Sequence, residues 1–257
     1  MREGTRQVPV MRRFFAIVAV AVVALSAWLA PSSAWAKGSS LGEPSRLEVP
    51  NAPDAYFYRP HVKGTRPILM YLHGRGGHPA DDCRKWARVA ARYGWVVCPS
   101  GPVDVGGGGR SWANGAGEAQ RVIDATVAAL RAKYKGRVQR RGNVLIGFSE
   151  GAFIAMQVGL KEQATWSRWL ILGAAEQYWP GDIAPELAPR KRKVKRVYLL
   201  TGENDGVAPS TQRVGERLKQ LKVPVRVKIA TGLGHEVPKD RMITMYRRPL
   251  AWLLAAK

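Results

Sequence analysis

The stretch that decides the fold is Asn143-Val144-Leu145-Ile146-Gly147-Phe148-Ser149-Glu150-Gly151. A short apolar run, typical of a buried strand, ends in Gly-x-Ser-x-Gly, and a helical pattern follows at once. A serine hydroxyl is a poor nucleophile, so it must stand clear of the sheet to reach a base and a substrate. The turn is so tight that bulky neighbours would clash, which explains Gly147 and Gly151. The following helix aims free backbone N–H groups at the same point, where a negatively charged oxygen could be held.

The N-terminus has the three parts of a secretory signal peptide. A basic region comes first, then an apolar run from Phe14 to Ala30, then the small-residue pattern Ala34-x-Ala36. We therefore predict a signal peptide over residues 1–36, cleaved after Ala36, and export to a periplasmic or extracellular compartment. An uncleaved membrane anchor is the alternative, although the run is shorter than the ~20 residues that a span needs.

Composition predicts one domain with a strongly positive surface. The chain has 257 residues, of which 46% are apolar, and a formal net charge of +22. That length supports one sizeable core, so we expect residues 37–257 to form a single domain. The charge should attract anionic polymers, lipid headgroups or acidic substrates. No helix-turn-helix, zinc-finger or RNA-binding signature accompanies it, so no specific nucleic-acid partner is predicted. A solvated basic surface without a dedicated partner is the alternative.

Apolar runs alternate with helical patterns along the rest of the chain. Besides the run before Ser149, strands are expected at residues 55–58, 67–72, 95–98, 169–172, 197–200 and 224–229. Helices are expected after Ser149 and at residues 82–93, 118–133, 211–221 and 240–256. This alternation predicts an α/β fold, with a mostly parallel sheet and helices on both faces. The glycine-rich loop 100–117 should border a site, which Trp112, Tyr178 and Trp179 could also line.

Three side chains are predicted to meet beyond the carboxyl ends of the strands. His235 is the one histidine, of four, that follows Ser149, and it lies in a loop just after the last expected strand. An acid should orient its imidazole and stabilise the protonated form. Asp205 lies directly after strand 197–200 and is the preferred acid, with Glu203 as the alternative. The candidate triad is therefore Ser149, Asp205 and His235, in that chain order.

This chain order of nucleophile, acid and base is that of the α/β-hydrolases. From about Pro67 onward, the sequence resembles α/β-hydrolase esterases, especially the compact phospholipase/carboxylesterase and dienelactone-hydrolase-like branches. The likeness is carried by four segments: Leu72-His73-Gly74-x-Gly76-Gly77, Ile146-Gly147-Phe148-Ser149-Glu150-Gly151, Thr201-Gly202-x-x-Asp205-x-x-x-Pro209 and Gly232-x-Gly234-His235.

The resemblance implies an oxyanion hole made of two backbone N–H groups. One belongs to Glu150, the residue after the nucleophile, and the other to Arg75, with Gly74 as the neighbouring candidate. A carboxylate beside the nucleophile could repel anionic acyl groups or turn to solvent, and the sequence leaves this open.

The resemblance further implies a serine hydrolase that cleaves carboxylic esters through an acyl-enzyme, without a metal or cofactor, and the signal peptide implies that this enzyme is secreted. A small serine peptidase or amidase with the same triad is one alternative. A non-catalytic protein that binds anionic components of the cell envelope is the other.

Two further predictions concern cysteines and charge. Cys83 opens a predicted helix and Cys98 ends the next strand, and in a parallel sheet these points share an edge, so export predicts a Cys83–Cys98 disulfide. Arg75 and Arg110 should lie at the mouth of the site and favour anionic ester substrates. The run 190–193 should lie at the opposite edge and bind weakly to an anionic envelope surface.

Overall fold

The structure, a computed structural model, describes residues 41–179 and 181–255. The predicted signal peptide and its cleavage site lie outside the described residues. None of the helices in this described part is long and apolar enough to cross a membrane.

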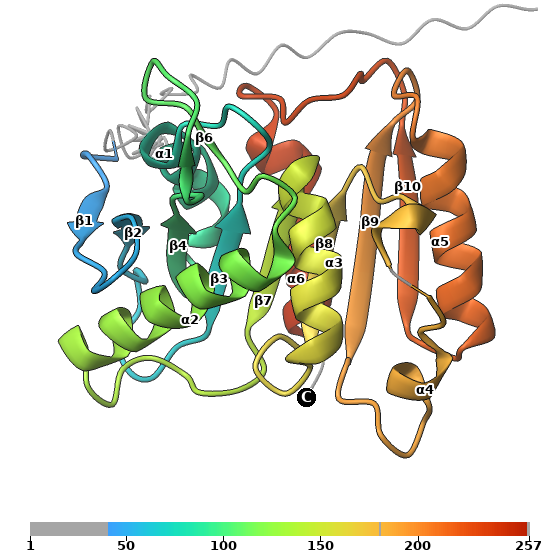
Figure 1. Cartoon of the computed structure of the whole chain (residues 1–257), viewed down its shortest axis with the longest axis horizontal. Coiled ribbons are helices and arrows are strands. Elements are labelled where there is room, and N and C mark those ends of the chain that lie inside the picture. Colours follow the sequence, from blue (N-terminus) through green and yellow to red (C-terminus); the bar gives the residue numbers. More distant parts are fainter. Residues whose placement is uncertain (1–40, 180, 256–257) are drawn as a thin grey trace, which may run out of the picture. The chain divides into compact units, whose positions relative to one another are not determined.

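One eight-stranded sheet organises the described residues (Figure 1). Its strands are β1 (Ser45–Leu47), β2 (Ala55–Tyr58), β3 (Ile68–Leu72), β4 (Trp95–Pro99), β7 (Val144–Phe148), β8 (Arg168–Leu172), β9 (Arg196–Gly202) and β10 (Val225–Ala230). The α-helices are α1 (Pro79–Ala90), α2 (Ala116–Lys133), α3 (Glu150–Lys161), α4 (Ala184–Leu187), α5 (Ala208–Gln220) and α6 (Met242–Leu254). A short 3₁₀ turn, η1 (Glu176–Tyr178), follows β8.

The strand order β1-β2-β4-β3-β7-β8-β9-β10 confirms the expected sheet. From β4 to β10 neighbouring strands are parallel, whereas β1 and β2 are antiparallel additions at one side. In parallel strands the carboxyl ends share an edge, so the loops after β3, β7, β8 and β9 open on one side of the sheet. Strand β10 ends the sheet on the other side, with Arg226 and Lys228 exposed.

Helices cover both faces of the sheet, as expected. Strand residues alternate between two separate apolar clusters, because successive side chains point to opposite faces. In β3, Ile68 and Met70 belong to the cluster that includes apolar residues of α2, α3 and α5, whereas Leu69 and Tyr71 belong to the cluster that includes α1 and α6. The buried strands are therefore continuously apolar, which is why their positions were readable from the sequence.

Two helices, α1 and α5, begin one turn earlier than their apolar periodicity predicts. Helix α1 begins at Pro79 and α5 at Ala208, where residues 82 and 211 were expected. Each has a proline in its first turn, where the missing N–H costs nothing, so the apolar periodicity begins one turn after the helix itself. The loop 100–117 also contains a small antiparallel hairpin, β5 (Val103–Asp104) and β6 (Arg110–Ser111), too short to show as alternation.

Candidate active site

Ser149 occupies a strained turn between β7 and α3. Its backbone has φ 54° and ψ −119°, a conformation that costs free energy in a non-glycine residue. The close packing of α3 enforces it: a Cβ on Gly151 would lie 2.1 Å from the Leu72 carbonyl oxygen, and one on Gly147 would lie 2.3 Å from the Gly151 carbonyl oxygen. The Ser149 N–H donates to the carbonyl of Leu172 in β8, at 3.1 Å. These contacts fix the serine above the carboxyl edge of the sheet.

The structure brings Ser149, His235 and Asp205 together. His235 Nε2 lies 2.8 Å from Ser149 Oγ, and His235 Nδ1 lies 2.7 Å from Asp205 Oδ2. An imidazole with its proton on Nδ1 donates to Asp205 and accepts from the serine hydroxyl. The Asp205 side chain is 6% exposed and that of His235 is 44% exposed, so the acid is shielded while the base faces the substrate side.

Asp205, and not Glu203, reaches the histidine. The second oxygen of Asp205 accepts the N–H of Val207 at 3.1 Å, which fixes the plane of the carboxylate. Glu203 instead accepts the N–H of Gly232 at 3.2 Å, within the loop that leads to His235. Both acids therefore support that loop, but one of them contacts the imidazole.

The two residues predicted to supply the oxyanion donors contact each other through their side chains. Arg75 Nη2 donates to Glu150 Oε1 at 3.1 Å, which links the loop after β3 to the first residue of α3. Within residues 41–179 and 181–255, the backbone N–H groups of Arg75 and Glu150 donate to no other group. A Cβ on Gly74 would lie 3.3 Å from the Ser149 Cβ, so this loop borders the serine directly.

The Glu150 carboxylate turns into the protein, which answers the question that the sequence left open. Its oxygens accept the Ser111 hydroxyl at 2.9 and 3.0 Å, the Trp112 N–H at 3.0 Å and the Asn114 N–H at 3.3 Å. Residues Ala113 and Asn114 have φ of 49° and 53°, so the carboxylate holds a strained loop. Sequence reasoning missed this role, because Ser111 and Asn114 are distant from Glu150 in the chain and form no motif with it.

The environment of Glu150 keeps it ionised. Burial alone would raise the pKa of this carboxyl, yet the hydrogen bonds from Trp112, Ser111 and Arg75 outweigh burial and lower the pKa from its ordinary value. A buried carboxylate with this many donors is therefore a fixed negative charge beside the proposed oxyanion donors.

His73 ties the loop after β3 to the loop after β4. Its Nδ1 donates to the Gly74 carbonyl at 2.8 Å, and its Nε2 accepts the Gly101 N–H at 3.0 Å. Burial lowers the pKa of His73, consistent with a neutral ring. Trp112 stacks on this ring and donates to the His73 carbonyl at 3.0 Å.

Several residues expected to line the site are held by contacts within the protein. Trp112 and Trp179 are buried, and each indole N–H donates to a backbone carbonyl. Arg110 donates to the carbonyls of Gly101 and Pro102 and pairs with Asp104, so it stabilises the hairpin of β5 and β6. Arg110 is therefore not a free charge at the mouth of the site, contrary to the prediction, whereas the Arg75 side chain is 64% exposed.

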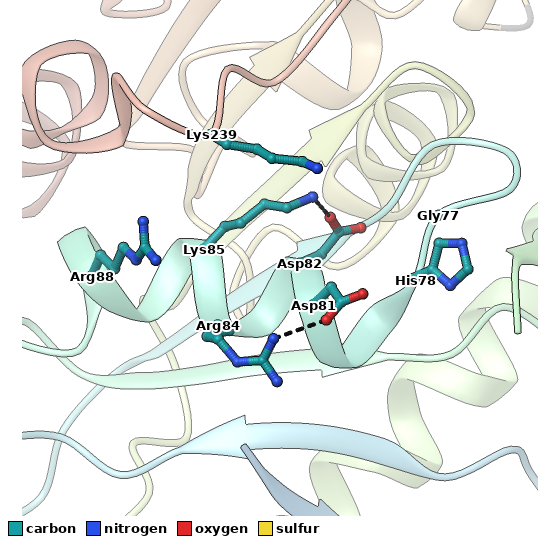
Figure 2. A pocket seen from close by; sticks show the side chains of 8 residues that line it. All are labelled: Gly77, His78, Asp81, Asp82, Arg84, Lys85, Arg88 and Lys239. Atoms are coloured by element: carbon teal, nitrogen blue, oxygen red, sulfur yellow. Dashed lines mark hydrogen bonds and ion pairs between the residues drawn. The ribbon is translucent and has the colours of Figure 1, made fainter. Parts of the chain in front are cut away.

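A cavity of about 440 Å³ lies beside the loops that carry Arg75 and His235. Gly77 and His78 belong to the first of these loops and Lys239 to the second, and α1 supplies the remaining wall (Figure 2). Lys85 pairs with Asp82 at 2.7 Å and Arg84 with Asp81 at 2.9 Å, as the dashed lines show. Arg88 and Lys239 complete the wall, so the cations outnumber the carboxylates.

The structure holds Cys83 and Cys98 as free, buried thiols, without the predicted disulfide. The Cys83 thiol donates to the carbonyl of Tyr56 at 3.3 Å, and Tyr56 is the partner of Cys98 in the pairing of β2 with β4. Burial, followed by the hydrogen bond with Cys83, raises the pKa of the Cys98 thiol well above its ordinary value. The two sulfurs are thus neighbours, and the disulfide stays a prediction for an oxidising compartment.

Replacing Glu150 with glutamine should lower the free energy of unfolding by about 2 kcal/mol, because one acceptor oxygen becomes a donor that faces N–H groups. The folded-state pKa of Glu150 is lowered, so its stabilisation is present above about pH 4.3 and is lost as the pH falls through the folded pKa. The stability gap between Glu150→Gln and the parent should therefore close in acid. Urea unfolding at pH values above and below about 4.3 measures this difference in the free energy of unfolding. Glu162→Gln, the same change at an exposed position, is the control.

Comparison with known proteins identifies the fold. No protein-family model matches the chain, and no curated protein matches it. The solved carboxylesterase of Bacillus cereus matches with 18% identity and a TM-score of 0.58, covering 79% of this chain and 94% of its own. Esterase PE8 matches with 22% identity and a TM-score of 0.56, covering 81% and 100%. FphF, a fluorophosphonate-binding serine hydrolase of Staphylococcus aureus in a substrate-bound form, matches with 13% identity and a TM-score of 0.62, covering 82% and 96%. The chain therefore has the α/β-hydrolase fold.

Proposed function

We propose that this protein is a serine hydrolase that cleaves carboxylic esters through an acyl-enzyme. One observation carries the proposal: hydrogen-bond contacts run without a break from Asp205 through His235 to Ser149. A nucleophile, a base and an orienting acid in this order are what acyl transfer requires. The structural likeness to esterases supports the reaction class and leaves the substrate undefined.

In the proposed reaction, His235 Nε2 takes the proton of Ser149 as Oγ bonds to the substrate carbonyl carbon. The carbonyl electron pair moves onto oxygen, where the N–H groups of Arg75 and Glu150 stabilise the charge. The carbonyl re-forms, the C–O bond to the alcohol breaks, and the alcohol leaves with the proton from His235. Water then repeats the sequence, which releases the acid and restores the serine. Asp205 stays ionised throughout and stabilises the imidazolium.

We also propose that the protein is exported, since residues 1–36 have a basic, apolar and Ala-x-Ala pattern. The mass of the exported protein checks cleavage after Ala36, and an intact N-terminus would support an anchor instead.

Ser149→Ala should abolish ester hydrolysis and labelling by a fluorophosphonate probe, because it removes the attacking oxygen. Stability should be unchanged within about 0.5 kcal/mol, since the side chain is not part of the core. Turnover of matched ester and amide substrates by the parent separates an esterase from an amidase. Labelling that persists in the variant would place the nucleophile elsewhere, and a parent that neither turns over nor labels would favour a non-catalytic binding protein.

Asp205→Asn should lower kcat by roughly 10⁴-fold, because an amide cannot hold the imidazole in the required tautomer. Glu203→Gln is the matched control: it changes a nearby acid of the same sheet edge that contacts Gly232 and not His235. Its kcat should fall far less. Steady-state kinetics of both variants compares the two, and a reversed order would assign the orienting acid to Glu203.

We propose further that anionic esters are favoured, because Arg75 is exposed at the serine and Lys239 extends from the His235 loop into a cation-rich cavity. Exposed charges act over about 8 Å at physiological salt. Lys239→Ser should lower kcat/KM for an acidic ester about threefold at low salt and leave a neutral ester unchanged. Lys63→Ser, a similar change of an exposed lysine outside this cavity, is the control. Equal effects on the two esters would contradict the preference.

A further inference from the structure

A second charged cavity lies at the opposite edge of the sheet, where β7, β8 and β9 begin (the lower edge in Figure 1). It has a volume of about 570 Å³ and is walled by three segments: residues 139–142, 164–168 and 189–195. At about 3.3 Å per residue, the extended segment from Gly142 to Ser149, which contains β7, places the cavity roughly 20 Å from the serine. The cavity is thus separate from the candidate active site.

Basic side chains dominate the wall of this cavity. The lining includes Arg141, Arg168, Arg192, Lys193 and Lys195, and none of the described lining residues is an aspartate or glutamate. The predicted surface-binding run 190–193 thus contributes two of its four residues to a defined hollow.

Backbone contacts fix the wall in place. Arg192 donates to the carbonyls of Leu221 and Lys222 at 3.1 and 2.9 Å, which secures the loop before β9 to the end of α5. The Lys193 N–H donates to Gln163 Oε1 at 2.9 Å, and the Lys195 N–H donates to the Ser167 carbonyl at 2.7 Å. The charges are therefore carried on a pre-organised frame, which lowers the entropy cost of binding.

Three of the basic side chains in this wall have no side-chain partner among the described residues. In the described part of the chain, the side chains of Arg141, Lys193 and Lys195 make no hydrogen bond or ion pair. Arg168 is buried, and burial followed by repulsion from Arg196 lowers its pKa. Like charges held in one hollow repel each other, and a bound anion would reduce that repulsion.

We propose that this cavity binds a phosphoryl group. Its divalent charge suits several unpaired cations, and guanidinium groups match phosphate oxygens in geometry and charge. The group could belong to a soluble phosphorylated compound or to the headgroup of an anionic lipid. The site does not depend on the proposed esterase reaction, because no residue of the candidate triad contributes to it.

Pyrophosphate is the probe, titrated calorimetrically into the full chain at physiological salt. Saturable binding is expected, and Lys193→Ser combined with Lys195→Ser should weaken it by about tenfold or more. The control combines Lys63→Ser with Lys228→Ser, which removes the same charge from exposed positions outside the cavity and should change the affinity less than about twofold. No saturable binding, or an equal loss in both double variants, would overturn the site.

A second arm separates the two sources of the phosphoryl group. Phosphatidylcholine vesicles with and without phosphatidic acid are sedimented with the parent and with both double variants. Adsorption that requires phosphatidic acid, is displaced by pyrophosphate and is lost with Lys193 and Lys195 assigns the site to a lipid headgroup. Pyrophosphate binding without such adsorption assigns it to a soluble phosphate. Far-UV circular dichroism and ester turnover should stay at parental levels in the cavity variant, which excludes unfolding as the cause.

Discussion

The close approach of α3 to β3 is the constraint on which the site depends. The Gly151 backbone lies against the carbonyls of Leu72 and His73, and no side chain larger than hydrogen fits between them. The helix can therefore begin only if the residue before it takes an unfavourable backbone conformation, and Ser149 takes it. Packing of the core thus offsets the strain and lifts the hydroxyl clear of the sheet.

Glu150 couples two tasks that usually fall to separate residues. Its backbone N–H is a proposed oxyanion donor, while its side chain anchors the loop of Trp112 and Asn114. A rotation of this residue would shift the proposed donor and the loop together. The ionised carboxylate also faces the Arg75 guanidinium, so the positive charge at the serine is partly balanced and its position is fixed. These contacts hold Glu150 in place, so the proposed oxyanion donor has a fixed position before substrate binds.

The fold was predictable because its signals are local. Buried parallel strands are continuous apolar runs, and the elbow at Ser149 combines one such run with glycines and a helix in a single short stretch. The contact of Asp205 with His235 could be predicted because both lie at the same edge of the sheet. Only the structure, however, shows that Asp205 and not Glu203 contacts the imidazole. The hydrogen bonds of Glu150 and the contacts of His73 were not predictable from the sequence. Their partners lie in loops, and the conformation of these loops leaves no periodic pattern in the sequence. The prediction that Arg110 is a free charge was wrong for the same reason, because its carbonyl partners belong to the hairpin that it stabilises.

The edge strand β10 bears on whether two copies of this protein can pair through their sheets. Strand β10 ends the described sheet, so one side of its backbone has no neighbouring strand. Such an edge is a template for strand addition, and proteins commonly protect it with charge. Here Arg226 stacks over the Trp252 ring at 4.8 Å, and Lys228 is exposed two residues further along. A second molecule that docked there would bring the same cations face to face. The repulsion between these cations would therefore oppose pairing of β10 with the same strand of a second copy.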